Sequence, residues 1–506
     1  MKRPLLRDFP PLALIVFVVG SASLGAEIAA ARLMAPFFGA STIVWANTIG
    51  VVLVALSVGY WVGGRFADRH PHKQGLCTLV LIAAVAVGLI PFAADPFLDL
   101  SVDALDNVSA GAFVGSLIGV SVLVAPPVML LGAASPWAIR LAVERVEESG
   151  TIAGRMYAIS TFGSLVGTFA SALLLIPLIG TRRTFLFFGL LCALVAISGL
   201  ARRRMLALAV PAAMIVVMAF PVGIIKASDE GTVLEEVDTE YQYARVVEQP
   251  DGQRELELNE GQAVHSVYRP GTYLTDNIWD EYLVGPFAVL ERPPAKIAIL
   301  GNAAGTTARA YGRYFPDTEV HGVEIDAELS RLGREYFDMR NPRLRLFHED
   351  ARPYLRRTDE RYDVIMVDAY RQPYIPFYLT TREFFELTRD RLAPGGVLIV
   401  NAAHFEGQDD LEKVLSATIT EAYPNVLRDP SEDVNTLLIA SASPASAGRL
   451  ARAAGTVLHE DLRPIAFATA GRIAPPLAGG TVYTDDKAPV EWLIDKSVVD
   501  YAAGSE

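Results

Sequence analysis

The chain has 506 residues, 52% of them hydrophobic, and its mean hydropathy is positive, which is unusual for a soluble protein of this size. One hydrophobic core cannot serve a chain this long, so at least two domains are expected. Residues 1–226 hold 16 Lys and Arg against 10 Asp and Glu, residues 227–506 hold 28 against 47, and the net charge is −13. This asymmetry predicts two physical environments, and the acidic half disfavours nucleic acid as a partner.

Long apolar stretches recur from residue 12 to about residue 227, each near the roughly 20 residues that cross a bilayer. The first is not a cleavable signal peptide, because it contains Glu27 and Arg32 and further spans follow it directly. Pro126 and Pro127 predict a kink or a break in the fourth stretch. The stretches predict about seven membrane spans, at 12–32, 42–64, 75–95, 112–139, 153–180, 184–201 and 205–226.

Basic residues gather before the first span and in the connections between spans two and three, four and five, and six and seven. The connection over residues 96–111 contains Asp but neither Lys nor Arg. Because cytoplasmic loops carry the excess of Lys and Arg, we expect a multi-pass cell-membrane protein with a cytoplasmic N-terminus. Seven spans would then leave the C-terminal half outside the cytoplasm, unless one stretch does not fully cross, so the side of that half stays open.

Two features of the membrane half suggest transport. A carboxylate inside a span, here Glu27, indicates an ion or substrate path, although a carboxylate that pairs with Arg32 near the helix end is the alternative. The segment 59–69 resembles the cytoplasmic loop signature of major-facilitator transporters. A transporter or sensor whose soluble part binds its ligand without turnover is therefore one hypothesis.

Residues 235–268 alternate like strands and predict a small β layer. From residue 295 short apolar strands alternate with helical patterns, which is typical of a parallel sheet. A strand at 296–300 runs into a loop from Gly301 to Gly305 and a helix that opens at Thr306. Small residues in this loop let the backbone approach a ligand. The next strand, 319–323, ends in Glu324, which is placed to hold both ribose hydroxyls.

Two further strands end in acids. Residues 344–347 lead to Asp350 and Ala351, where the Asp can accept a hydrogen bond from an adenine amino group. Residues 362–367 lead to Asp368, and a fifth strand at 397–400 follows a Pro-Gly-Gly turn. Each acid alone could be a helix N-cap or a solvated strand end. Together with the loop they predict one nucleoside-binding crevice of the S-adenosylmethionine type, since the loop is short of the NAD pattern. No metal site is expected, and the two distant cysteines predict no disulfide framework.

Over roughly residues 235–405 the sequence resembles the spermidine synthase (polyamine aminopropyltransferase) family, specifically its membrane-fused members. Gln242 stands in the family's Tyr-Gln pair near the thioether nucleoside. Residues 323–326 match the ribose-binding strand end, and Asp350 with Ala351 matches the adenine-binding turn. Asp368 matches the first Asp of the catalytic segment, and the run through Tyr370 to residue 385 has the form of the membrane-fused branch, as does 484–491.

The sequence also departs from the family at the reacting end of the site. Ala304 stands where soluble members carry an Asp that holds the donor's amine, and Arg371 replaces the second catalytic Asp. The Tyr on the family's substrate-entry helix aligns with Trp279, beside Asp280 and Glu281, which we expect to contribute to substrate binding. The resemblance implies that Asp368 is the base that takes a proton from the amine.

These observations predict an all-α, multi-span membrane domain at 1–226, a small β-rich part at 227–290, and a Rossmann-like transferase domain at 291–506. The leading hypothesis is a membrane-anchored aminopropyltransferase that uses decarboxylated S-adenosylmethionine and putrescine or another amine. An S-adenosylmethionine-dependent methyltransferase is the alternative, because Arg371 could pair with the methionine carboxylate. The partners expected are the lipid bilayer, a small-molecule amine and a second copy of the chain in a homodimer.

Overall fold

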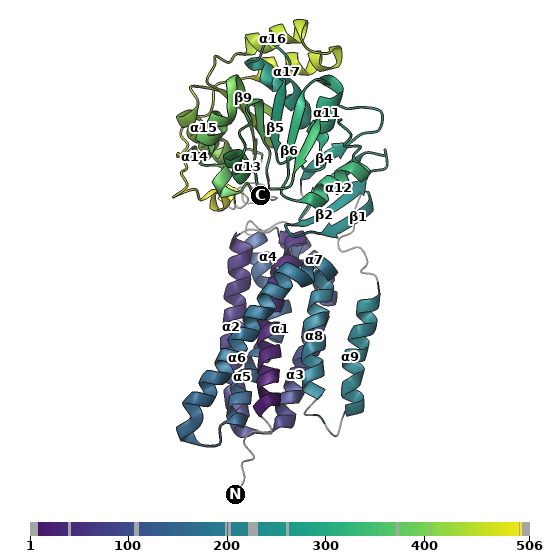
Figure 1. Cartoon of the computed structure of the whole chain (residues 1–506), viewed down its shortest axis with the longest axis vertical. Helices are drawn as coiled ribbons and strands as arrows, with labels where there is room; N and C mark the ends of the chain where they lie inside the picture. The colour runs from purple at the N-terminus through teal and green to yellow at the C-terminus, as the bar shows by residue number, and fades with distance from the viewer. Residues whose placement is uncertain are drawn as a thin grey trace. The chain divides into compact units, whose positions relative to one another are not determined.

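The computed structural model describes residues 9–38, 42–105, 111–197, 200, 204–220, 231–259, 263–370, 374–404, 406–494 and 496–497. The chain divides into two compact units, Met1–Ala227 and Ser228–Glu506. The first is a bundle of helices and the second contains all of the described strands (Figure 1).

The N-terminal unit contains five segments that are long and apolar enough to cross a membrane: Leu12–Ala35, Val44–Arg69, Lys73–Ala94, Val114–Ala142 and Val146–Ile179. Its helical elements are α1 (Phe9–Phe38), α2 (Thr42–Arg69), α3 (Lys73–Leu105), α4 (Gly111–Gly119), η1 (Val120–Val124), α5 (Ala125–Ala142), η2 (Val146–Glu148), α6 (Ser149–Ala170), η3 (Ser171–Leu175), α7 (Ile176–Ile179), α8 (Thr181–Ile197) and α9 (Arg204–Ala219).

The sixth and seventh predicted spans, 184–201 and 205–226, fall on α8 and α9, which have 17 and 16 residues. At a rise of about 1.5 Å per residue each is roughly 25 Å long, somewhat shorter than the roughly 30 Å hydrocarbon core of a bilayer. The structure thus separates these two helices from the five longer segments, and the total number of spans stays a prediction.

Three prolines of the N-terminal unit, Pro126, Pro127 and Pro177, coincide with changes of helical form. Pro126 and Pro127 follow η1, a π-helical turn, and the chain continues through it into α5 without a break in helix. A second π-helical turn, η3, precedes Pro177 at the start of α7. Because proline lacks an N–H and its ring clashes with the preceding turn, a locally widened turn accommodates it. The predicted interruption is therefore a π-helical turn.

Small residues bring α1 and α6 close together. The Ser21 hydroxyl donates to the Gly163 carbonyl at 2.8 Å, and the Ser164 hydroxyl donates to the Gly20 carbonyl at 3.2 Å. A methyl group at Gly167 would lie only 2.1 Å from the carbonyl oxygen of Ser21. Close backbone approach through Gly and Ser, with hydroxyl-to-carbonyl bonds between helices, is how helices associate in lipid.

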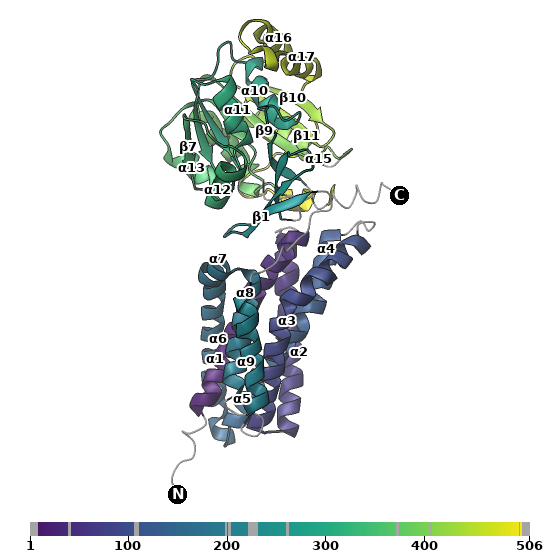
Figure 2. The ribbon, with the colours of Figure 1, turned by 90° about the vertical axis from the view of Figure 1, so that its right-hand side faces the viewer.

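The C-terminal unit begins with an antiparallel sheet of β1 (Thr232–Asp238), β2 (Tyr243–Glu248), β3 (Arg254–Leu258) and β4 (Val264–Tyr268), in that order. This is the predicted β layer, with four strands. It is followed by α10 (Ile278–Val284) and η4 (Gly285–Ala288). Figure 2 shows this small sheet apart from the larger one that follows.

The main sheet has seven strands in the order β10-β11-β9-β8-β5-β6-β7. The first five in sequence are parallel, β5 (Lys296–Leu300), β6 (Glu319–Val323), β7 (Leu344–Phe347), β8 (Tyr362–Val367) and β9 (Leu392–Ala403), and β11 (Asn435–Ser441) and β10 (Asn425–Glu432) add an antiparallel edge. The connecting and C-terminal helices are α11 (Thr306–Tyr314), α12 (Ala327–Tyr336), α13 (Ala351–Arg357), η5 (Phe377–Leu379), α14 (Arg382–Arg391), α15 (Asp410–Ala422), α16 (Ala447–Thr456), η6 (Glu460–Leu462) and α17 (Arg463–Arg472).

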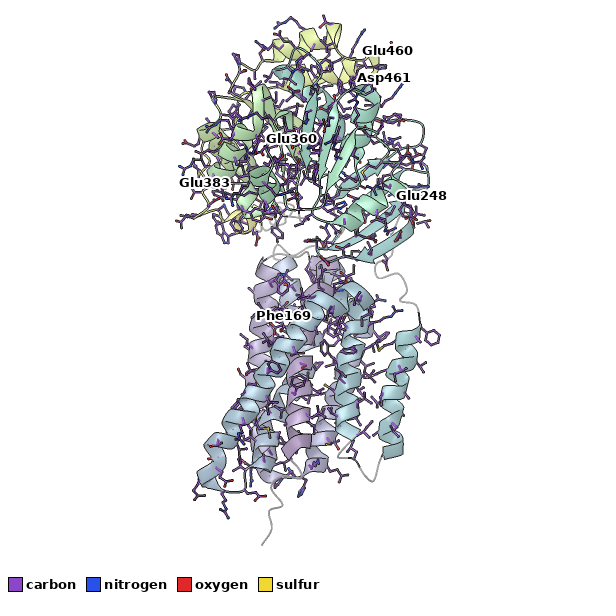
Figure 3. The ribbon with its side chains drawn as sticks, viewed as in Figure 1. Phe169, Glu248, Glu360, Glu383, Glu460 and Asp461 are labelled. Atoms are coloured by element: carbon purple, nitrogen blue, oxygen red, sulfur yellow. The ribbon has the colours of Figure 1, made fainter. Side chains whose placement is uncertain are left out.

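Helices cover both faces of this sheet, so its central strands β5, β6 and β8 are buried at nearly every position and mostly apolar. Alternate residues of β5 enter two different cores: Ala298 and Leu300 pack on one face, and Ile297 and Ile299 on the other. Most of the described acidic residues of this half are half-buried or exposed, although Glu412 and Asp429 are fully buried. The acidic residues labelled in Figure 3 within this unit are half-buried or exposed: Glu248, Glu360, Glu383, Glu460 and Asp461.

We predict that Gly167→Ala destabilises the N-terminal unit by about 1–3 kcal/mol, because the added methyl must push α1 away from α6. The measurement is the thermal unfolding midpoint of the purified full chain in detergent. Gly154→Ala is the matched control on the same helix, since no heavy atom lies within 4 Å of a Cβ placed there. Equal midpoints for the two variants would contradict this account of the contact.

Candidate nucleoside and amine site

The loops that follow β5 and β8 touch at the carboxyl edge of the main sheet. Gly301 has φ +92°, and a Cβ there would lie 2.3 Å from the carbonyl oxygen of Asp368. The Asp368 amide donates to the Leu300 carbonyl at 2.9 Å. Because β5 lies between β8 and β6, this is the point where the strand order reverses, and open α/β sheets bind ligands there. The predicted glycine loop and the predicted base therefore meet.

Glu324 lies directly after β6 and is buried. Its two carboxylate oxygens accept backbone hydrogen bonds, from the amide of Ala303 at 2.9 Å and from that of Asp326 at 3.0 Å. Burial raises the pKa of Glu324 to about 7, against the lowering effect of these two amides. The carboxylate is thus held in place beside the glycine loop and titrates near neutral pH.

The β layer and α13 complete the same region. Thr239 donates to the side chain of Asp326 at 2.6 Å, next to Gln242, whose buried Oε1 has no partner among the described residues. Asp350 is the N-cap of α13 and accepts from the amide of Arg352 at 2.9 Å. The Tyr378 hydroxyl donates to the other Asp350 oxygen. The sequence allowed each strand-end acid to be only a helix N-cap, and Asp350 does cap α13. Its second carboxylate oxygen, however, contacts Tyr378 and not bulk water.

Most of the residues named so far line one small pocket of about 70 Å³. It receives side chains or backbone from six of the predicted cofactor and base positions: Gln242, Gly301, Glu324, Asp350, Ala351 and Asp368. Tyr370 also borders it. At one end of the pocket Glu324 can accept hydrogen bonds from the hydroxyls of a ribose, and at the other end Asp350 can accept one from the amino group of an adenine. The structure therefore brings together the predicted nucleoside-binding residues except Gly305.

A larger cavity of about 450 Å³ adjoins the small pocket. The two share Gly301, Ala303, Asp368, Tyr370 and His265 as walls. The larger cavity continues past Trp279 and Tyr282 of α10 to the ends of β9, β10 and β11. Asp368 is thus the carboxylate that both spaces have in common.

Asp368 is held by neutral partners. The Asn401 amide donates to its Oδ1 at 2.9 Å, and the buried Tyr282 hydroxyl faces it. Burial raises the pKa of Asp368 above its usual range, although Asn401 and Tyr282 each act to lower it. A carboxylate with a raised pKa is a better proton acceptor than an exposed one when it is ionised.

Tyr370 fixes the loop that carries Asp368. Its hydroxyl donates to the carbonyl of Asn401 at 2.8 Å and accepts from the amide of Ala403 at 2.9 Å. Both partners belong to the end of β9, so the segment after β8 is tied to the neighbouring strand. Arg371, the other residue predicted here, lies outside the described residues.

Several predicted site residues have other roles. Gly305, with φ +87°, is the N-cap of α11 and packs against Met339. Asp280 accepts hydrogen bonds from the amides of Thr275 and Asp276 and lines neither pocket. Glu281 pairs with Arg472 at 3.1 Å, also away from both pockets.

Helical periodicity explains this division of α10. Residues 278, 279 and 282 share the face that borders the cavity, and 280 and 281 point elsewhere. Trp279 is therefore the member of the predicted trio that lines the cavity. Ala304 stands where the family carries an Asp. Its side chain packs with Leu329 and Leu332, and its backbone N–H donates to the Ser266 hydroxyl at 3.0 Å. Residue 304 therefore faces the β layer.

Other lining residues were not predicted from the sequence. Tyr282 and Asn302 sit beside motifs that were recognised, so helical spacing and the loop position were available signals. Asn401 ends a strand that was predicted without a role. Glu432 comes from the antiparallel hairpin of β10 and β11, which carried no recognised motif, and only the sheet order brings it to the cavity.

The chain is similar in sequence to known proteins. Residues 277–428 match the family described as "Spermine/spermidine synthase domain". A probable polyamine aminopropyl transferase of Bifidobacterium longum is 34% identical over 262 residues, which cover 47% of this chain and 58% of that protein. Polyamine aminopropyltransferase 2 of Aquifex aeolicus is 24% identical over 492 residues, or 91% of this chain and 94% of that protein.

A crystal structure described as a probable spermidine synthase from Corynebacterium glutamicum aligns with 52% of this chain and 100% of its own, at 22% identity and a TM-score of 0.39. The chain spans about half the length of the first curated relatives it matches, namely 58%, 50% and 46%. The family resemblance seen in the sequence is confirmed at the level of the domain: residues 277–428 match the spermine/spermidine synthase domain, and the chain is similar in sequence to polyamine aminopropyltransferases. Its fusion to a membrane domain stays a prediction.

Proposed function

We propose that this protein is a membrane-anchored aminopropyltransferase, which moves the aminopropyl group of decarboxylated S-adenosylmethionine to putrescine or another amine. The observation that carries the proposal is the position of Asp368, which borders both a pocket suited to a nucleoside and a larger cavity with carboxylates. The names of the homologous aminopropyltransferases support the same reaction class.

The nucleoside would occupy the small pocket. Its ribose hydroxyls would donate to Glu324, and its adenine would lie between Asp350 and the β layer near Gln242. The sulfur would then lie near Gly301, where the absence of a side chain lets a ligand come close to the backbone. The aminopropyl group would extend into the larger cavity past Asp368.

In the reaction the lone pair of the acceptor nitrogen forms a bond to the methylene carbon beside the sulfonium. The carbon–sulfur bond breaks, and its electron pair stays on sulfur, which leaves the neutral thioether methylthioadenosine. The nitrogen loses one proton, and Asp368 is placed to take it. Tyr282 and Asn401 would hold the carboxylate in position during this transfer.

The large cavity favours the decarboxylated donor. Among its described lining residues there are two carboxylates, Asp368 and Glu432, and neither Lys nor Arg. Among these described residues, the carboxylate of an intact methionine tail would find no cation to pair with in this acidic space. We therefore expect a calorimetric preference for the donor that lacks its carboxylate.

Asp368→Asn should lower kcat by about 10²- to 10⁴-fold, because the amide cannot accept the proton. The assay is methylthioadenosine formation by the purified full chain, and nucleoside binding by calorimetry shows whether the pocket persists. Asp359→Asn is the control, since Asp359 is exposed and precedes the start of β8, at the end of the strand opposite Asp368. Unchanged turnover in Asp368→Asn would remove Asp368 as the base, and no turnover by the wild type with any amine would refute the proposed reaction.

Methylthioadenosine should bind about tenfold more tightly at pH 8 than at pH 6. Below the pKa of about 7, Glu324 is protonated and is a poorer acceptor for ribose hydroxyls, so affinity is lost as pH falls. Glu324→Gln should bind more weakly and remove this pH dependence, which calorimetry at several pH values can measure. Glu335→Gln, at an exposed position of α12, serves as the control. A pH profile of Glu324→Gln that matches the wild type would contradict the role of this carboxylate.

We further propose that the N-terminal unit is a multi-pass cell-membrane domain with its N-terminus in the cytoplasm. Five long apolar segments and the distribution of basic residues support this orientation. A membrane-impermeant maleimide should label Asp103→Cys in intact cells, whereas His72→Cys should be labelled only after permeabilisation. The reverse pattern would show that the orientation is inverted.

A further inference from the structure

The segment 484–491 has no part in the chemistry proposed above, and it lies beyond residues 277–428, which match the family. Its first acid, Asp485, reaches back to the nucleoside half of the site. Two guanidinium nitrogens of Arg352 donate to the Asp485 carboxylate, Nη1 to Oδ1 at 2.8 Å and Nη2 to Oδ2 at 2.6 Å. The Arg352 side chain is only 8% exposed, and Asp485 is its ion-pair partner among the described residues.

This ion pair is fixed on both sides. A bidentate pair between arginine and a carboxylate sets direction as well as distance, because two parallel bonds must form together. The hydrogen bond from Arg352 holds the pKa of Asp485 below its usual range, so the carboxylate stays ionised at neutral pH. The Thr381 hydroxyl donates to Oδ1 of Asp485 at 2.8 Å, and the amide of Asp485 donates to the Glu383 side chain at 3.0 Å.

Arg352 connects Asp485 to the end of the small pocket that suits an adenine. Its Nη1 also donates to the carbonyl of Tyr378 at 3.0 Å. The amide of Arg352 donates to one oxygen of Asp350, and the Tyr378 hydroxyl donates to the other. Asp350 and Tyr378 line the pocket, whereas Arg352 and Asp485 stand behind them. Both groups that hold the Asp350 carboxylate therefore belong to residues that the pair of Arg352 and Asp485 fixes.

A carboxylate at position 350 can distinguish purines, because an ionised carboxylate accepts hydrogen bonds and cannot donate them. A 6-aminopurine offers it a donor. A 6-oxopurine would place an acceptor against an acceptor, and a buried acceptor without a donor is costly. This discrimination requires that the carboxylate point in one direction.

We propose that Asp485 is a positioning residue for base recognition: through Arg352 it fixes Asp350 and Tyr378, and thereby sets the preference for a 6-aminopurine nucleoside over a 6-oxopurine nucleoside. This inference rests on the nucleoside binding of the proposed function and adds the source of its selectivity. It assigns a role to a segment that lies more than 100 residues after the pocket wall in the sequence.

The test measures the Kd of methylthioadenosine and of methylthioinosine by calorimetry, with the purified full chain. The wild type should bind methylthioadenosine at least about tenfold more tightly, because the oxo compound leaves buried acceptors unpaired. Asp485→Asn should weaken methylthioadenosine about tenfold and methylthioinosine less than about twofold. The physical reason is that Arg352, left without its counter-charge, no longer holds Tyr378 and Asp350 in one position.

Asp486→Asn is the matched control, since Asp486 is the next residue, is exposed, and forms no ion pair with a described residue. Its two Kd values should equal those of the wild type. Arg352→Lys keeps the charge but not the bidentate geometry, so it should reduce the selectivity by a smaller factor, about threefold. In Arg352→Gln the further change Asp485→Asn should cost no additional selectivity, because both residues act through one contact.

A selectivity that is unchanged in Asp485→Asn would overturn the inference. So would equal losses for the two nucleosides, which would show that the ion pair only stabilises the fold. If Asp485→Asn does not fold, Arg352→Lys decides by the same two criteria. A wild type that binds methylthioadenosine but transfers no aminopropyl group would refute the proposed reaction, and the binding ratios would still decide the role of Asp485. A wild type that binds neither nucleoside would refute both.

Discussion

The contact between Gly301 and the backbone of Asp368 is the constraint on which the site depends. It joins the two loops at the reversal of strand order, and it requires a residue without a side chain in a left-handed conformation. Because the loops touch, the small pocket lined by Glu324 and the larger cavity share Gly301 and Asp368 as a common wall. A bulkier residue at position 301 would displace Asp368 and narrow the small pocket at the same time.

Much of the fold could be predicted from the sequence because its signals are local. The order of strands and helices from residue 296 follows from short apolar runs that alternate with amphipathic ones, and the acids at the strand ends follow from the same pattern. The long apolar segments up to residue 179 were equally clear. The π-helical turns before Pro126 and Pro177 were not predicted as such, because proline signals a departure from the α-helix without specifying its form.

The sequence predicted the site residues that lie at strand ends within a motif. It predicted less well the residues whose place depends on the direction in which the side chain points. Glu324, Asp350 and Asp368 follow their strands directly, so their place at the crevice follows from topology. Asp280 and Glu281 differ from Trp279 by the face of α10 on which they lie, and the start of that helix decides the face. Asn401 and Glu432 reach the cavity through long-range pairing of β9, β11 and β10, which no local pattern reports.

The shared wall has a thermodynamic consequence. His265, Ala303 and Tyr370 border both spaces, so a ligand in either one fixes side chains that the other must contact. Coupling between two such sites is reciprocal: whatever factor a ligand in one space contributes to affinity in the other, the second ligand contributes to the affinity of the first. If the proposed donor and acceptor occupy the two spaces, these shared walls link their binding before any bond is made.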